Sequence, residues 1–106
     1  MPEILFGQWD PVLTKISAAL SQYEADHQGA HATLYRQNSV SVRIRIIDPS
    51  FSERGKADRG EQVWQYLRKL PRRVQSDISV LLLLTPDETQ TSFANMDFDR
   101  PLPSTL

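Results

Sequence analysis

The sequence contains no cysteine, and this absence excludes several classes of function at once. Disulfide scaffolds, thiolate-bound zinc, cysteine-ligated iron–sulfur clusters and cysteine nucleophiles all require that residue. Long apolar runs are also missing: the longest, from Val80 to Leu84, has five residues, against the roughly twenty of a membrane-spanning helix. The N-terminus lacks the basic and apolar regions of a signal peptide. We therefore expect a cytoplasmic protein that does not enter a membrane.

Recognisable catalytic and metal-binding motifs are absent as well. The sequence has no Gly-x-Ser-x-Gly, no His-Glu-x-x-His and no dinucleotide fingerprint. Its two histidines, His27 and His31, are four residues apart, but Gly29 between them argues against a continuous helix that would direct both at one metal. The carboxylates are scattered along the chain. We expect a protein that is not an enzyme and that uses no metal or other cofactor.

The chain of 106 residues has the length of one domain, and its 40% hydrophobic and 24% charged residues are typical of a globular protein. The net charge of −1 is unevenly distributed. Between residues 31 and 76, ten Lys or Arg residues stand against four Asp or Glu residues, which leaves seven net negative charges elsewhere. Such asymmetry indicates either a basic binding face beside an acidic tail or a chance spread over a folded surface.

The first helix is predicted over residues 11–28. Asp10 can cap its free amides, and Pro11 suits the first helical position. Apolar residues then recur at steps of three and four, as one buried helical face requires: Leu13, Ile16, Leu20 and Tyr23. Gly29 can take the left-handed conformation that ends a helix.

The next segments alternate between apolar and polar residues, which is typical of strands buried on one face. Residues 32–37 and 40–46 are predicted to form an antiparallel hairpin. A second helix is predicted over residues 57–70 and a third strand over residues 78–84. Because a β–α–β crossover returns the chain in the same direction, the third strand should lie parallel to the second.

These elements predict an α+β fold in the order α-β-β-α-β. The sheet would be mixed and three-stranded, with both helices packed on one face. Residues 1–88 would form this single domain. Residues 89–106 form an acidic, proline-containing tail, for which packing on the sheet is one expectation.

Several segments resemble the second half of BolA-like proteins, whose fold is related to the class II KH domain. They are Phe51, then Arg59-Gly60-Glu61-Gln62-Val63-Trp64-Gln65-Tyr66-Leu67, then Leu84-Thr85-Pro86-Asp87-Glu88. The resemblance covers about residues 40–88 and implies the same fold. In that family, histidines help to hold an iron–sulfur cluster shared with a monothiol glutaredoxin. Gly60 and Asp77 stand at the matching positions here, so the cluster chemistry does not carry over.

The leading functional hypothesis is a small non-enzymatic adaptor or regulatory domain that binds a protein partner through the sheet edge or the open face. If Ile78, Val80, Leu82 and Leu84 face the helices, then Leu81 and Leu83 face outward and need cover. The tail could provide that cover through Phe93, Met96 or Phe98, or a second copy of the chain could do so in a homodimer. Leu81 and Leu83 are therefore candidate partner-binding residues.

The alternative hypothesis is a domain that binds single-stranded nucleic acid, which the KH relationship suggests. A basic face could contact phosphates, and Tyr35 could stack on a base. The candidate residues are Arg43, Arg45, Arg68, Lys69, Arg72 and Arg73. The Gly-x-x-Gly clamp of KH domains is missing, since four residues separate Gly55 from Gly60. A simpler interpretation of the cluster after residue 67 is that its cations complement the C-terminal dipole of the second helix.

Overall fold

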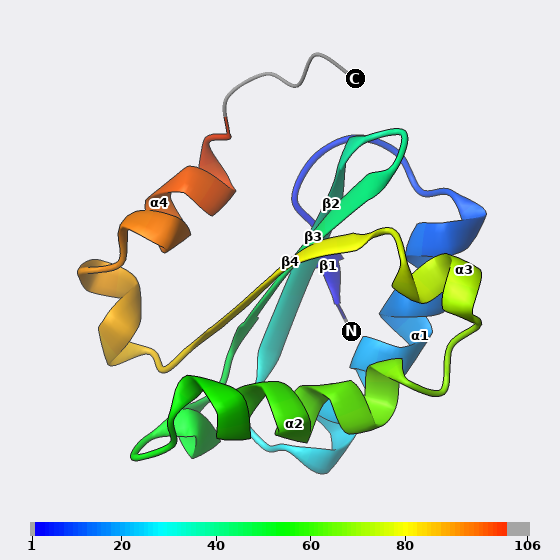
Figure 1. Ribbon diagram of the computed structural model, residues 1–106. Helices are drawn as coiled ribbons and strands as arrows, with labels where there is room; N and C mark the ends of the chain where they lie inside the picture. The colour runs from blue at the N-terminus through cyan, green and yellow to red at the C-terminus, as the bar shows by residue number, and fades with distance from the viewer. Residues whose placement is uncertain (1, 102–106) are drawn as a thin grey trace.

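The computed structural model describes residues 2–101, which form four α-helices, two 3-10 helices and a four-stranded sheet (Figure 1). The strands are β1 (Glu3–Ile4), β2 (His31–Asn38), β3 (Ser41–Ile47) and β4 (Ile78–Leu84). The α-helices are α1 (Pro11–Asp26), α2 (Lys56–Leu67), α3 (Arg72–Gln75) and α4 (Phe93–Asp99). The 3-10 helices η1 (Pro49–Phe51) and η2 (Asp87–Gln90) follow β3 and β4. The last five residues of the predicted tail, 102–106, lie outside the described part.

The sheet is mixed, with the strand order β1-β2-β3-β4. β2 and β3 form the predicted antiparallel hairpin, and β4 lies parallel to β3, which confirms the crossover prediction. The prediction of three strands is wrong, because β1 adds a fourth strand parallel to β2. With two residues, β1 is too short to show any periodicity in the sequence.

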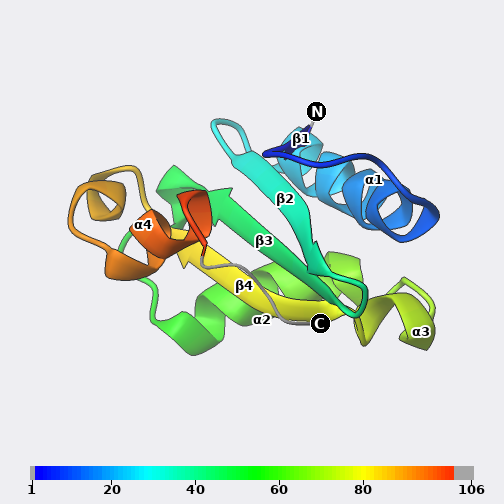
Figure 2. The ribbon, with the colours of Figure 1, turned by 90° about the horizontal axis from the view of Figure 1, so that it is seen from above.

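The main core lies between the sheet and the two long helices, α1 and α2, as predicted (Figure 2). α1 contributes Leu13, Ile16, Leu20 and Tyr23, all fully buried, and α2 contributes Val63 and Leu67. The second helix ends at Leu67, three residues before the predicted end. Beyond Leu67 the turns tighten: the Lys69 amide donates to the Tyr66 carbonyl at 3.4 Å and the Leu70 amide to the Leu67 carbonyl at 3.1 Å, three residues back instead of four. Among residues 2–101, no helix combines the length and apolar character needed to cross a bilayer.

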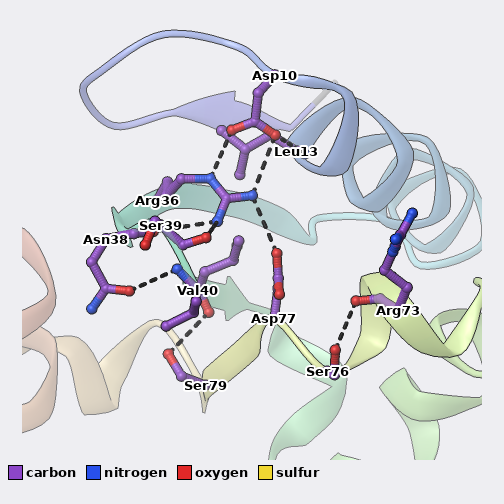
Figure 3. Close-up of polar contacts among 11 residues, drawn as sticks. Asp10, Leu13, Arg36, Asn38, Ser39, Val40, Arg73, Ser76, Asp77 and Ser79 are labelled. Carbon is purple, nitrogen blue, oxygen red and sulfur yellow. Dashed lines mark hydrogen bonds and ion pairs between the residues drawn. The ribbon is translucent and has the colours of Figure 1, made fainter. Parts of the chain in front are cut away.

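One arginine joins three distant segments on the side of the sheet near α1 (Figure 3). Arg36 donates to Asp10 at 2.8 Å and to Asp77 at 3.4 Å, and it also donates to the backbone oxygens of the β2–β3 turn, at Asn38 and Ser39. Asp10 also caps α1, since its Oδ1 accepts from the Leu13 amide at 2.9 Å. Arg36 therefore fixes the start of α1 against the hairpin turn and the start of β4.

A buried polar network holds the other end of α1. The Tyr23 hydroxyl donates to the Asp48 carboxylate at 2.5 Å and accepts from Gln62 of α2 at 2.9 Å. Asp48 follows β3 and caps η1 through the Ser50 amide at 2.8 Å. Burial, and then the hydrogen bond to Asp48, raise the pKa of Tyr23. The network ties α1 and α2 to the end of β3, where the β–α–β crossover begins.

Candidate functional site

β4 forms one edge of the sheet, and its backbone groups alternate between β3 and the outside. The Leu84 carbonyl points to β3, because it accepts from the Asp48 amide at 2.9 Å. The Leu83 carbonyl points outward, where the Arg59 guanidinium of α2 donates to it at 3.0 Å. By the same alternation, the amide and carbonyl of Leu81 face outward. No further strand lies beside β4 among residues 2–101.

The position of Arg59 is fixed by Glu88 of η2. The guanidinium makes two parallel hydrogen bonds to the carboxylate, at 2.6 and 3.0 Å. Glu88 also accepts from the Thr85 amide at 2.9 Å. The hydrogen bonds from Arg59 and then from Thr85 lower the pKa of Glu88 to about 2, and Glu88 in turn raises the pKa of Arg59. Arg59 therefore occupies the outward carbonyl of Leu83 and leaves the outward backbone groups of Leu81 to other partners.

A groove of about 450 Å³ lies beside this edge. Its floor is made by the four leucines from Leu81 to Leu84. One wall consists of Lys56 and Arg59 from α2. The other comes from η2, the start of α4 and the two residues between them, with Glu88, Thr91, Ser92 and Ala94. The groove thus combines an apolar floor, charged side chains at its rim and an edge strand with outward backbone groups.

The predicted orientation of Leu81 and Leu83 is wrong. Their side chains point to the helices and pack against the main core, opposite Ile44 and Ile46 of β3. The reason is a bulge: Val42 pairs with Ile78 and Arg43 with Val80, so Ser79 is an extra residue in β4. One extra residue exchanges the two faces of a strand for everything that follows it. A partner at this edge would meet the backbone of Leu81 rather than an exposed pair of leucine side chains.

The sheet face opposite α1 and α2 is covered by α4. Phe98, which is only 1% exposed, packs its ring edge-on against Tyr35 at a centroid distance of 4.8 Å, and its carbonyl accepts from the Tyr35 hydroxyl at 2.8 Å. Arg43 and Arg45 of β3 pair with Asp97 at 3.0 Å and Asp99 at 2.6 Å. The face predicted to be open is therefore closed, and two of the candidate nucleic-acid-binding arginines lie beneath an acidic helix.

The tail thus packs on the sheet through one of its three predicted apolar anchors. Phe98 is buried, whereas Phe93 and Met96 are 85% and 65% exposed. Phe98 contacts the face that carries Tyr35 and Arg45, rather than Leu81 and Leu83.

The other four candidate cations lie on the helical side of the molecule, in α3 and in the turn that precedes it. Arg68 pairs with Glu61 at 2.7 Å, and the Lys69 ammonium lies 5.8 Å from the centre of the Tyr66 ring. Arg72 and Arg73 are exposed on α3. Because α3 and α4 lie on opposite sides of the sheet (Figure 1), the six candidates do not form one surface.

A second depression, of about 370 Å³, lies between the end of α1 and the exposed side of α2. Its lining is polar and includes His27, Gln62 and Tyr66. His27 stacks on Tyr23 with ring centres 4.0 Å apart, and its Nδ1 lies 2.9 Å from the Tyr23 carbonyl. In the described part of the chain, no three His, Cys, Asp or Glu side chains gather as metal ligands would. Gly55 is the N-cap of α2 and Gly60 lies inside the helix, so the two glycines do not belong to one loop.

Comparison of the chain with known proteins gives no match: no protein-family model, no curated protein and no solved structure is significantly similar to it. The function must therefore be inferred from the geometry of the edge, the groove and the covered face.

Proposed function

We propose that this protein is a non-enzymatic adaptor that binds an extended segment of a partner protein along the outer edge of β4. The observation that carries the proposal is the groove of about 450 Å³ beside an edge strand whose backbone groups at Leu81 point outward. An extended peptide can add a strand to such an edge, with main-chain hydrogen bonds giving affinity and side-chain pockets giving specificity.

The chemistry of the groove favours an apolar segment with a carboxylate near one end. The leucine floor and Ala94 suit apolar side chains on the side of the groove near α4. Lys56, the first residue of α2, lies at the rim, and it forms none of the ion pairs found among residues 2–101, so an acidic side chain of the partner suits that position. Arg59 already occupies the carbonyl of Leu83. Pairing would therefore centre on Leu81.

The closed sheet face also supports the edge rather than the face as the binding surface. α4 covers Tyr35, Arg43 and Arg45, whereas the outer edge of β4 carries no further strand among residues 2–101. A relationship to BolA-like proteins is a separate proposal, which concerns the fold and not the binding site. The order of the predicted elements agrees with it, but the sheet has four strands where the resemblance implies three.

The proposal can be tested with a displayed library of random linear peptides selected against the purified chain. Ala94→Arg places a long charged side chain on the exposed wall of the groove without touching the core, and Met96→Arg is the matched control on the same helix. Selected peptides should lose binding to the Ala94→Arg variant and keep it with the control. In NMR spectra of the complex, the Leu81 amide should shift and exchange with solvent more slowly.

Selected peptides that bind both variants equally would contradict the proposal, and so would the absence of any selected peptide. Sedimentation over a range of concentrations separates one more case. A dimer that dissociates in the Ala94→Arg variant alone would assign the edge to a second copy of the chain, and the partner-segment proposal would fail.

A further inference from the structure

The contact between α4 and the sheet pairs carboxylates with arginines in a regular way. Arg43 and Arg45 lie on the same face of β3. They are two residues apart, which corresponds to about 7 Å along the strand. Asp97 and Asp99 of α4 meet them one to one, at 3.0 and 2.6 Å. Each arginine therefore holds an anion that the chain itself supplies.

Aromatic rings stand beside these arginines. Tyr35 lies opposite Arg43 in the β2–β3 register and accepts a hydrogen bond from it at 3.2 Å. The ring of Phe6 lies 4.3 Å from the Tyr35 ring on one side, and Phe98 of α4 covers another. Alternating arginines beside an aromatic surface are the combination that single-stranded nucleic acids bind, through phosphate contacts and base stacking.

The cover that α4 provides is incomplete and shallow. The Arg45 Nε is buried without a hydrogen-bond partner among the described residues, so α4 leaves one donor of this face unsatisfied. Phe98 is the one fully buried residue of this seven-residue helix, and both carboxylates are about half exposed. A helix this short has little stability of its own, and exposed ion pairs are screened by salt.

We infer that the β2–β3 face is a binding site for single-stranded nucleic acid, and that α4 occupies it as a competitor within the same chain. Asp97 and Asp99 take the positions of two backbone phosphates, and Phe98 takes the position of a base on Tyr35. Release of α4 makes the face available. This inference rests on contacts of β2 and β3 rather than on the edge of β4. Ala94 of α4 also lines the groove beside β4, so release of α4 opens one wall of that groove, but the two proposals are tested with different variants and ligands.

Two variants of the full chain release α4 in different ways. Asp97→Asn with Asp99→Asn removes the competing anions, and its matched control, Asp58→Asn with Asp87→Asn, removes the same charge outside the contact. Phe98→Ser removes the buried anchor and leaves the net charge unchanged. Circular dichroism and thermal unfolding establish that each variant is folded.

Binding is measured by the anisotropy of a labelled single-stranded oligonucleotide. If the face is free about one tenth of the time in the native chain, both releasing variants should bind about tenfold more tightly, because the apparent affinity scales with the competent fraction. The control should bind as the native chain does. Adding Arg43→Gln and Arg45→Gln to Phe98→Ser should abolish the gain, and the affinity should fall linearly with salt on logarithmic axes.

The inference fails if neither variant binds better than the control, or if the gain survives the loss of both arginines. A competition experiment gives a second test, with tripolyphosphate and unlabelled oligonucleotide compared at the same phosphate concentration. The inference also fails if both displace the labelled oligonucleotide equally, because the site would then recognise charge and not bases.

Discussion

The hydrogen bond between Tyr23 and Asp48 permits a sharp test of what holds this fold together. Both residues are fully buried, and the 2.5 Å contact joins α1 to the chain segment that follows β3. Tyr23→Phe removes the hydroxyl and keeps the ring, so the stacking on His27 and the edge contact with Tyr66 remain. The Asp48 carboxylate keeps one of its hydrogen bonds, from the Ser50 amide.

The size of the expected stability loss depends on which polar groups lose a hydrogen-bond partner in Tyr23→Phe. Hydrogen bonds to carboxylates contribute roughly 1.5–3 kcal/mol, and a buried acceptor that loses its donor cannot recover the bond from water. The Gln62 side-chain amide loses one acceptor, the Tyr23 hydroxyl, but still donates to the Ser50 hydroxyl at 2.9 Å. It therefore adds little to the loss of unfolding free energy. We expect the free energy of unfolding to fall by about 2 kcal/mol, which for a domain of this size lowers Tm by roughly 8–16 °C.

The assay is urea unfolding at neutral pH, followed by tryptophan fluorescence, with the slope m unchanged between the variants. Tyr66→Phe is the matched control. Its hydroxyl donates to the exposed Asp26 at 2.6 Å, where water can replace the partner, so we expect a loss of about 0.5 kcal/mol or less. A Tyr23→Phe loss no larger than that of the control would refute the reasoning, because the Asp48 network would then contribute no more than a surface contact.

Two further predictions concern the edge of β4. The pKa of Glu88 is lowered from 4.5 to about 2, so the stability that its pairing with Arg59 provides is complete above pH 4.5 and is lost as the pH falls through 2. Since the Glu88 side chain is 41% exposed, we expect about 1 kcal/mol, measured as the difference between the acid unfolding curves of the native chain and Glu88→Gln; identical curves would contradict it. The alternation of backbone groups predicts that the Leu82 amide, which is directed at β3, exchanges with solvent more slowly than the Leu81 amide, which points outward. Hydrogen exchange followed by NMR compares the two amides, and the opposite order would show that the edge has been assigned to the wrong residues.

The parts of the fold that the sequence predicts are those with local causes. The cap at Asp10 and the apolar stripe of α1 act within a few residues, and so does the alternation in β2 and β3. The faces of β4 were predicted wrongly, because Ser79 interrupts the alternation and the run that follows it is apolar on both faces. Nothing in a window of seven residues distinguishes a bulge from a regular strand there.

The candidate site depends on pairings that no local pattern reveals. Arg59 pairs with Glu88, which is 29 residues away in the sequence, and Arg43 pairs with Asp97, which is 54 residues away. The sequence shows an excess of basic residues in the middle of the chain and of acidic residues in the tail. That asymmetry and the apolar residues Phe93, Met96 and Phe98 were the available signals that the tail folds back onto the sheet, and neither identified the partner of any single residue.

The contact of Arg59 with Leu83 has a consequence for solubility. The five residues from Val80 to Leu84 are uniformly apolar and uncharged, which is the signature of a segment that starts aggregation when it lies at a free sheet edge. Many proteins protect such a strand with a charge placed inside it or beside it in sequence. Here the charge comes from α2, and Glu88 keeps it in place. The protection therefore exists only after α2 and β4 have docked, so a newly made or partly unfolded chain exposes this strand without it.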